Sequence, residues 1–201
     1  MEKFIGSFIL ESDKVIITDP YYERDSLYAI NKVIKNMLPG KYNAYIELSD
    51  EGSWGKRVAN LNVRHEKTNM ACTTERFNDI CVDSGQCGFF DYNKYPSFSK
   101  SPEEKDYDEE KDYDNESGFY KRACNTTGEN SYTEGTLYTM PEGVVTHCGF
   151  GDGCYNGMVV RNKDGKAFEV FVTYIEEEEK LSYTEDDWED EEDFDDDDDD
   201  E

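Results

Sequence analysis

The segment YNGMVVRNKDGKAFEVFVTYI, residues 155–175, decides the fold class. Two runs rich in β-branched and aromatic residues flank Lys163-Asp164-Gly165-Lys166. An Asp-Gly pair between alternating apolar runs is the strongest short-range signal for a β-hairpin. We therefore predict two antiparallel strands, at residues 155–162 and 167–175.

Strand signals continue toward the N-terminus. After the turn formed by Pro39 and Gly40, the alternating residues of 41–48 predict a half-buried strand, and residues 57–64 alternate in the same way. The turn-forming residues between 4–10 and 15–18 predict a hairpin of these two strands. Two interpretations stay open for residues 27–38, because their apolar residues recur at helical spacing while the Ile and Val residues also suit a strand.

Short candidate strands also occur at residues 77–82, 135–140 and 143–148. With 15 Tyr, 11 Phe and many glycine-containing turns, the chain has the composition of an all-β domain. We therefore expect a mainly β protein, an antiparallel sandwich or partly open barrel of about seven to nine short strands with at most one or two short helices.

The charge is distributed unevenly along the chain. Of the net charge of −27, residues 176–201 contribute −18 and residues 103–116 contribute −7, which leaves the rest close to neutral. Segments of such composition bury too little apolar surface to offset their conformational entropy. The sequence predicts a single domain at 1–175, with an acidic low-complexity insertion at about 99–118 and a disordered acidic tail at 176–201.

The acidic balance and the apolar runs bear on partners and location. Nucleic acid and anionic membranes both need a basic face, so direct binding to either is disfavoured. No run approaches the roughly 18 apolar residues of a membrane span, and the start resembles no export signal. We expect a cytoplasmic protein whose six cysteines are all free thiols. The cysteine spacing favours buried thiols over a zinc site.

The loop from Asp83 to Asp91 is the first candidate site. Ser84 has a nucleophile's hydroxyl, the two aspartates have oxygen ligands, and Gln86 can orient a ligand. A serine hydrolase also needs a base, and neither histidine lies in a Gly-x-Ser-x-Gly elbow. The alternative is a structural turn in which an aspartate accepts backbone hydrogen bonds.

The loop from Gly149 to Tyr155 is the second candidate, with Asp152 and Tyr155 as its polar groups. Its glycines permit close approach of a ligand or of another strand, but their spacing is not that of a nucleotide-binding loop. Asp19 and Tyr21, in an Asp-Pro-Tyr-Tyr turn, add a carboxylate and an aromatic ring that suit the rim of a pocket.

Four blocks give the chain a resemblance to a bacterial domain of unknown function 4241 family. They are TDPYY at 18–22, the block at 38–55 that contains LPGKYNAY, DSGQCGFFD at 83–91 and GFGDGCY at 149–155. Cys87 stands where the pattern has a small residue, and the acidic segments are additions. The resemblance implies a bacterial cytosolic domain without an assigned activity. It also implies that these residues converge on one site: Asp19, Asp83, Ser84, Gln86, Asp91, Asp152 and Tyr155.

Three functional hypotheses follow. The first is a non-enzymatic binding module, without cofactor or metal, that recognises a protein or small ligand through the Asp83 and Asp152 loops. The second is a metal-assisted hydrolase with Asp19, Asp83, Asp91 and Asp152 as oxygen ligands for Mg²⁺ or Ca²⁺. The third is a nucleic-acid mimic that binds a basic protein through the acidic tail.

Overall fold

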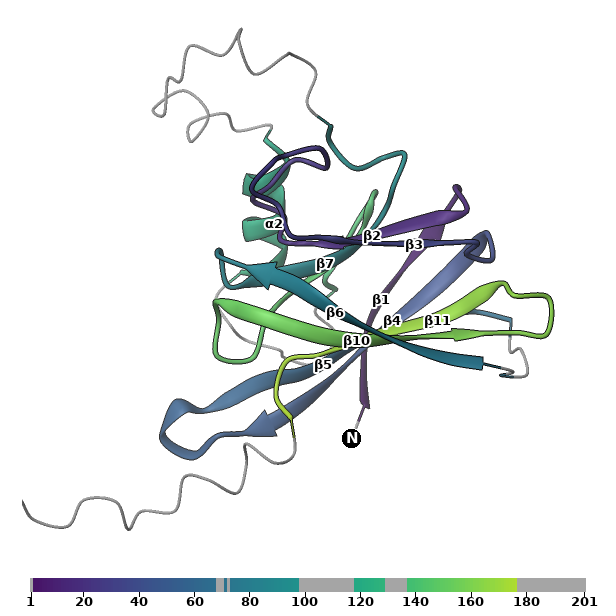
Figure 1. The fold of residues 1–201 in the computed structure, drawn as a ribbon. Coiled ribbons are helices and arrows are strands. Elements are labelled where there is room, and N and C mark those ends of the chain that lie inside the picture. The colour runs from purple at the N-terminus through teal and green to yellow at the C-terminus, as the bar shows by residue number, and fades with distance from the viewer. Residues whose placement is uncertain (1, 68–70, 72, 98–117, 129–136, 177–201) are drawn as a thin grey trace, which may run out of the picture.

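Two antiparallel sheets make up the fold in a computed structural model that describes residues 2–67, 71, 73–97, 118–128 and 137–176 (Figure 1). The first sheet, in spatial order, comprises β1 (Glu2–Leu10), β4 (Gly40–Asp50), β5 (Lys56–His65), β11 (Ala167–Thr173), β10 (Gly153–Arg161) and β6 (Thr73–Val82). The second comprises β3 (Lys32–Lys35), β2 (Lys14–Thr18), β7 (Gln86–Asp91), β9 (Gly143–His147) and β8 (Thr139–Met140). The mainly β prediction is confirmed, although the described residues form eleven strands where about seven to nine were expected.

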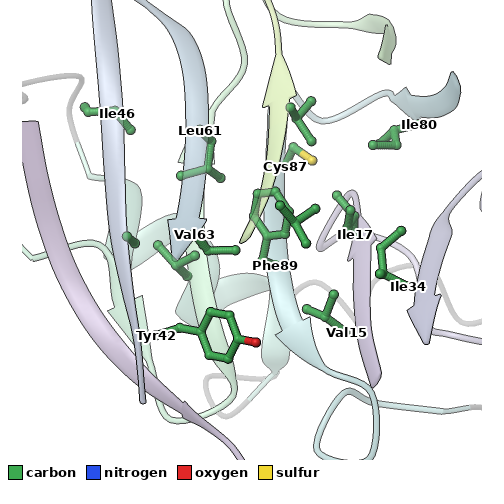
Figure 2. Packing of buried hydrophobic residues seen from close by; sticks show 14 of the residues in the cluster. Val15, Ile17, Ile34, Tyr42, Ile46, Leu61, Val63, Ile80, Cys87 and Phe89 are labelled. Atoms are coloured by element: carbon green, nitrogen blue, oxygen red, sulfur yellow. The ribbon is translucent and has the colours of Figure 1, made fainter. Parts of the chain in front are cut away.

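One hydrophobic core lies between the two sheets (Figure 2). Ile46, Leu61 and Val63 of the first sheet point toward Ile17 and Phe89 of the second, and none of these side chains is more than 1% exposed. Strand alternation places their apolar side chains on one face. The two sheets pack as a sandwich, and in the described part of the chain neither closes into a complete barrel.

Helix α2 (Phe119–Thr127) covers the outer face of the second sheet (Figure 1). Ala123 is fully buried, and Phe119 packs edge-on against Phe90 and Tyr95 with ring centroids 5.2 and 4.8 Å apart. Every residue of β7 is therefore buried, as expected of a strand covered on both faces.

The hairpin predicted at residues 155–175 is confirmed. Strands β10 and β11 pair antiparallel, and Gly165 takes a φ of 72° in the turn. Asn162 also fixes the turn, because its side-chain Oδ1 accepts the amides of Asp164 and Lys166, each at 3.0 Å.

The hairpin predicted from residues 4–10 and 15–18 is wrong, although both segments are strands. β1 pairs with β4 in the first sheet, whereas β2 pairs with β3 and β7 in the second. The turn residues between them carry the chain from one sheet to the other. Turn chemistry predicts where a strand ends, but long-range pairing decides its partner.

Residues 27–38 contain a strand and no helix. β3 covers Lys32–Lys35, while Leu27 and Tyr28 are 89% and 78% exposed. A helix here would need these apolar side chains on a buried face, and no part of the described structure covers them.

The predicted insertion at 99–118 and tail at 176–201 fall almost wholly outside the described residues. Among the residues that are described, no helix has the length and apolar character needed to cross a membrane.

Candidate functional site

Asp19 holds the Asp83 turn in place. Its carboxylate is completely buried just after β2 and accepts the amides of Tyr21, Asp83 and Ser84 at 2.8, 2.9 and 2.8 Å. The Ser84 hydroxyl donates to the same carboxylate at 2.6 Å. Four hydrogen bonds occupy Asp19, so this residue stabilises the loop from within.

Helix α2 joins the same turn through a chain of polar side chains. Tyr120 lies beside Ser84 and Cys124, and burial, together with the interaction with Cys124, raises the pKa of Tyr120 to about 12. Gln86 Nε2 lies 3.3 Å from Cys124 Sγ, and Gln86 is 5% exposed. Ser84 and Gln86 are therefore brought together, with the helix as their common contact.

Aromatic rings and a carboxylate flank this turn on its exposed side. The Tyr22 hydroxyl donates to Asp83 Oδ2 at 2.6 Å, and this bond, together with burial, raises the pKa of Tyr22 to about 12. Tyr21 is 53% exposed and contacts Tyr22 and Tyr120 edge-on, with ring centroids 5.1 and 5.3 Å away. Tyr21 is thus held in place while its ring remains accessible.

The loop from Gly149 to Tyr155 lies directly against the Asp83 turn. The Cys148 amide donates to the Gly85 carbonyl at 3.0 Å, and a Cβ added to Gly85 would lie 3.8 Å from Gly151 Cα. The Tyr155 hydroxyl donates to the Gly151 carbonyl at 2.6 Å, and Asp152 is exposed at the loop tip. The sequence-predicted loops therefore meet at one end of the sandwich.

A disulfide between Cys81 and Cys154 links the strands at this end, so the prediction of six free thiols is wrong. The two residues lie directly opposite each other on β6 and β10, with Cα atoms 4.1 Å apart. The prediction rested on the expected compartment and took no account of strand register. Cys87, Cys124 and Cys148 are free, and Cys72 lies outside the described residues.

Two of the free thiols are buried together between the sheets. Cys87 and Cys148 are completely inaccessible and belong to the same core cluster. Burial raises the pKa of the Cys148 thiol, which makes it a poor nucleophile. Both residues belong to the core, as predicted for buried thiols.

Asp91 is not part of this cluster. It ends β7 five residues after Gln86, which is about 17 Å along an extended strand. Its buried carboxylate accepts the amides of Glu11, Ser12 and Asn93 at 2.7, 2.9 and 2.9 Å. Burial raises the pKa of Asp91, but these hydrogen bonds outweigh burial and the pKa lies below its ordinary value.

The metal-ligand set of the hydrolase hypothesis is not assembled. Asp19 and Asp91 lie near opposite ends of β7, and backbone amides occupy both carboxylates. Within the described residues, no group of three or more His, Cys, Asp and Glu side chains is close enough to hold a metal ion.

Sequence reasoning missed an aromatic pair beside the two loops. Trp54, in the short 3-10 turn Gly52–Trp54, and Phe150 are 66% and 48% exposed, with ring centroids 6.1 Å apart. The available signal was a large aromatic residue close to glycines in each of two segments, residues 52–55 and residues 149–153. Tyr120 and Cys124 were also missed, and only the packing of α2 brings them to Ser84 and Gln86.

Comparison with known proteins places the chain in a family. Neither a curated protein nor a solved structure matches it. Residues 8–172 match the family described as "Protein of unknown function (DUF4241)". This range covers most of the chain and includes the Asp19 and Asp83 turns and the Gly149 loop. The chain therefore belongs to the DUF4241 family, as its resemblance to that family implied.

Proposed function

We propose that the protein is a non-enzymatic binding module that recognises a partner protein through the loop end of the sandwich. We define the loop-end surface as the exposed or half-exposed side chains of Tyr21, Tyr22, Trp54, Asp83, Phe150 and Asp152. The observation that carries the proposal is that the two contacting loops, with the Asp19–Tyr22 turn and the Gly52–Trp54 turn beside them, present these aromatic and acidic groups in one connected strip.

Contacts connect the strip from end to end. Trp54 packs on Phe150. The next residue, Gly151, lies against Gly85 in the Asp83 turn. From that turn the Asp83 carboxylate binds Tyr22, which contacts Tyr21. A surface fixed by disulfide, hydrogen bonds and ring contacts loses little conformational entropy on binding.

The composition of the loop-end surface suggests the chemistry of its partner. Aromatic side chains that are partly exposed but held in place are typical binding hot spots. Asp83 and Asp152 add negative charge at the centre of the strip. We therefore propose a protein partner that presents Lys or Arg beside apolar side chains.

The engagement of Ser84 and Asp19 also favours binding over catalysis. The Ser84 hydroxyl donates a hydrogen bond to the Asp19 carboxylate, which also accepts hydrogen bonds from three backbone amides. A nucleophilic serine needs a base that is free to take the proton and is oriented by a third group. The Asp19 carboxylate instead accepts hydrogen bonds from the backbone amides of the turn that it stabilises.

Site-specific photo-crosslinking tests the proposal. A photoreactive phenylalanine analogue replaces Phe150 in one variant and Ile9 in a matched control, since the two native side chains are 48% and 49% exposed. A third variant carries the analogue at Tyr21. We expect the variants at Phe150 and Tyr21 to crosslink to the same protein, and the variant at Ile9 not to crosslink to it. Adding Asp83→Ala and Asp152→Ala to the variant with the analogue at Phe150 should abolish crosslinking to that protein.

Two outcomes would contradict the proposal. Equal capture from the Ile9 position would show that the loop end has no special role. Capture that survives the two alanine substitutions but is lost when the aspartates at 195–200 become asparagine would favour the nucleic-acid-mimic hypothesis, because the acidic tail would then carry recognition.

A further inference from the structure

The outer face of the first sheet carries two neighbouring rows of side chains fixed by strand register. The first row is polar and crosses four strands as Glu47, Asn60, Thr173 and Asn156. The second row is more apolar and crosses five strands as Tyr45, Asn62, Phe171, Met158 and Arg76. Helix α2 covers the other sheet, so this face stays open in the described structure (Figure 1).

The face is hollowed along these rows. One cavity of about 690 Å³ is lined by the whole first row, by Phe171, Met158 and Arg76 of the second row and by Asn78. A second cavity of about 290 Å³ adjoins it and is lined by Tyr45 and Asn62. Glu47, Asn60 and Phe171 line both cavities, so together they form one groove. Five strands at a spacing of about 4.8 Å make the groove about 19 Å long, enough for an extended ligand.

Hydrogen bonds orient two of the amides in the groove. Asn60 Nδ2 donates to Glu47 Oε2 at 3.0 Å, and Asn62 Nδ2 donates to Glu169 Oε1 at 2.9 Å. A side-chain amide can make up to four hydrogen bonds as donor and acceptor, so each keeps further capacity. Asn156, on the same row, is exposed.

The charges of the groove favour a neutral ligand. Arg64, at one end, is paired with both Glu2 and Glu169. Arg76 is the second cation of the groove, and the carboxylates of Glu2, Glu47, Glu169 and Glu176 outnumber the two arginines, so no excess of positive charge remains for phosphate or sulfate. Planar amides and carboxylates suit pairs of hydroxyl groups, while Phe171 and Met158 offer an apolar surface to C–H groups.

We propose that this groove is a second binding site, separate from the loop-end surface, and that it takes a neutral oligosaccharide. The sugar hydroxyls bond the row of Glu47, Asn60 and Asn156. The apolar faces of its rings pack on Phe171 and Met158. A chain of several sugar units spans the groove, whereas a monosaccharide fills only part of it.

Titration of the full-length, ¹⁵N-labelled protein with maltohexaose, cellohexaose and chitohexaose tests the proposal. At least one of these should shift amide signals of β5, β10 and β11. Asn156→Ala should weaken its affinity about tenfold, as expected for loss of one well-placed hydrogen-bonding side chain. Asn93→Ala is the matched control, because Asn93 is also exposed but follows the end of β7, outside the groove.

The remaining outcomes decide against the groove. Absence of shifts with all three hexasaccharides overturns the proposal, as does equal binding by the Asn156→Ala and Asn93→Ala proteins. Tighter binding of a sulfated hexasaccharide than of its neutral counterpart overturns the neutral-ligand assignment. None of these results bears on crosslinking from Phe150, so the two sites are tested independently.

Discussion

Asp19 and Asp91 are buried carboxylates whose partners are mostly backbone amides. From sequence alone both were candidate ligand-binding residues, Asp19 as a carboxylate at the rim of a pocket and both as oxygen ligands for a metal ion. Their hydrogen bonds instead hold two turns to strands that are distant in sequence. Each therefore contributes to stability, and only Asp19 also shapes the loop end.

Replacing Asp91 with asparagine tests this role. An amide leaves at least one of the three donor N–H groups without an acceptor, which should cost about 1–3 kcal/mol of unfolding free energy at neutral pH. The lowered pKa means that the stabilisation is present above the unfolded pKa of about 3.9 and is lost as pH falls through the folded value. Urea unfolding at several pH values should show the difference from wild type shrinking below about pH 4.

The control for Asp91 is the exposed turn residue Asp164. Asp164→Asn should leave the unfolding midpoint nearly unchanged. Similar losses for the two variants, or a loss that does not depend on pH, would show that the Asp91 carboxylate is not the stabilising group.

The disulfide between Cys81 and Cys154 closes a loop with a sequence separation of 73 residues. Replacing both cysteines with serine should lower the unfolding free energy by about 2–5 kcal/mol, since a cross-link restricts the unfolded chain. Non-reducing mass spectrometry should find the two residues in one linked peptide. An unfolding midpoint unaffected by the substitutions, and by reductant in the wild type, would contradict the assignment.

At the scale of elements, β7 and β9 pack so closely that a side chain cannot fit between them at Gly143. A Cβ there would collide with the carbonyl of Phe89. Gly143→Ala should therefore destabilise the fold by about 1–3 kcal/mol or more, as other overpacked sites do. Thermal unfolding monitored by circular dichroism gives the measurement.

Gly55→Ala is the control for backbone strain without collision. The φ of 74° and ψ of −165° at Gly55 lie in a region essentially restricted to glycine, and nothing lies near its missing side chain, so the substitution should cost about 1–3 kcal/mol from strain alone. Gly143 has no positive φ, so a negligible cost for Gly143→Ala beside a clear cost for Gly55→Ala would show that the β7–β9 spacing does not require glycine at position 143.

For the whole molecule, the distribution of apolar residues predicts an independent domain. The buried hydrophobic residues of the described structure run from Ile5 to Ile175, directly before the acidic tail. A chain that ends at Glu176 should unfold cooperatively at a temperature close to that of the full-length protein. Loss of cooperative unfolding would show that residues 177–201 contribute to the fold.

Strand locations and the class of fold could be predicted because they depend on short-range signals. Alternation in residues 41–48 and 57–64 and the Asp-Gly turn at 164–165 report which face of each strand is buried. The pairing of β1 with β4 could not be predicted, because the same alternation suits any partner. The helix-or-strand question at 27–38 depended likewise on what covered those residues.

The sequence by itself determined that this is a mainly β protein with its charge concentrated in two segments, because composition and periodicity are properties of the chain. It also identified the loops that begin at Asp83 and at Gly149 as candidate sites, and these two loops are in contact in the structure. Only the tertiary structure decided that Asp91 lies apart, that Cys81 faces Cys154, and that Asn60, Thr173 and Asn156 form one row. These depend on register between strands far apart in sequence, which is set by the packing of the whole core.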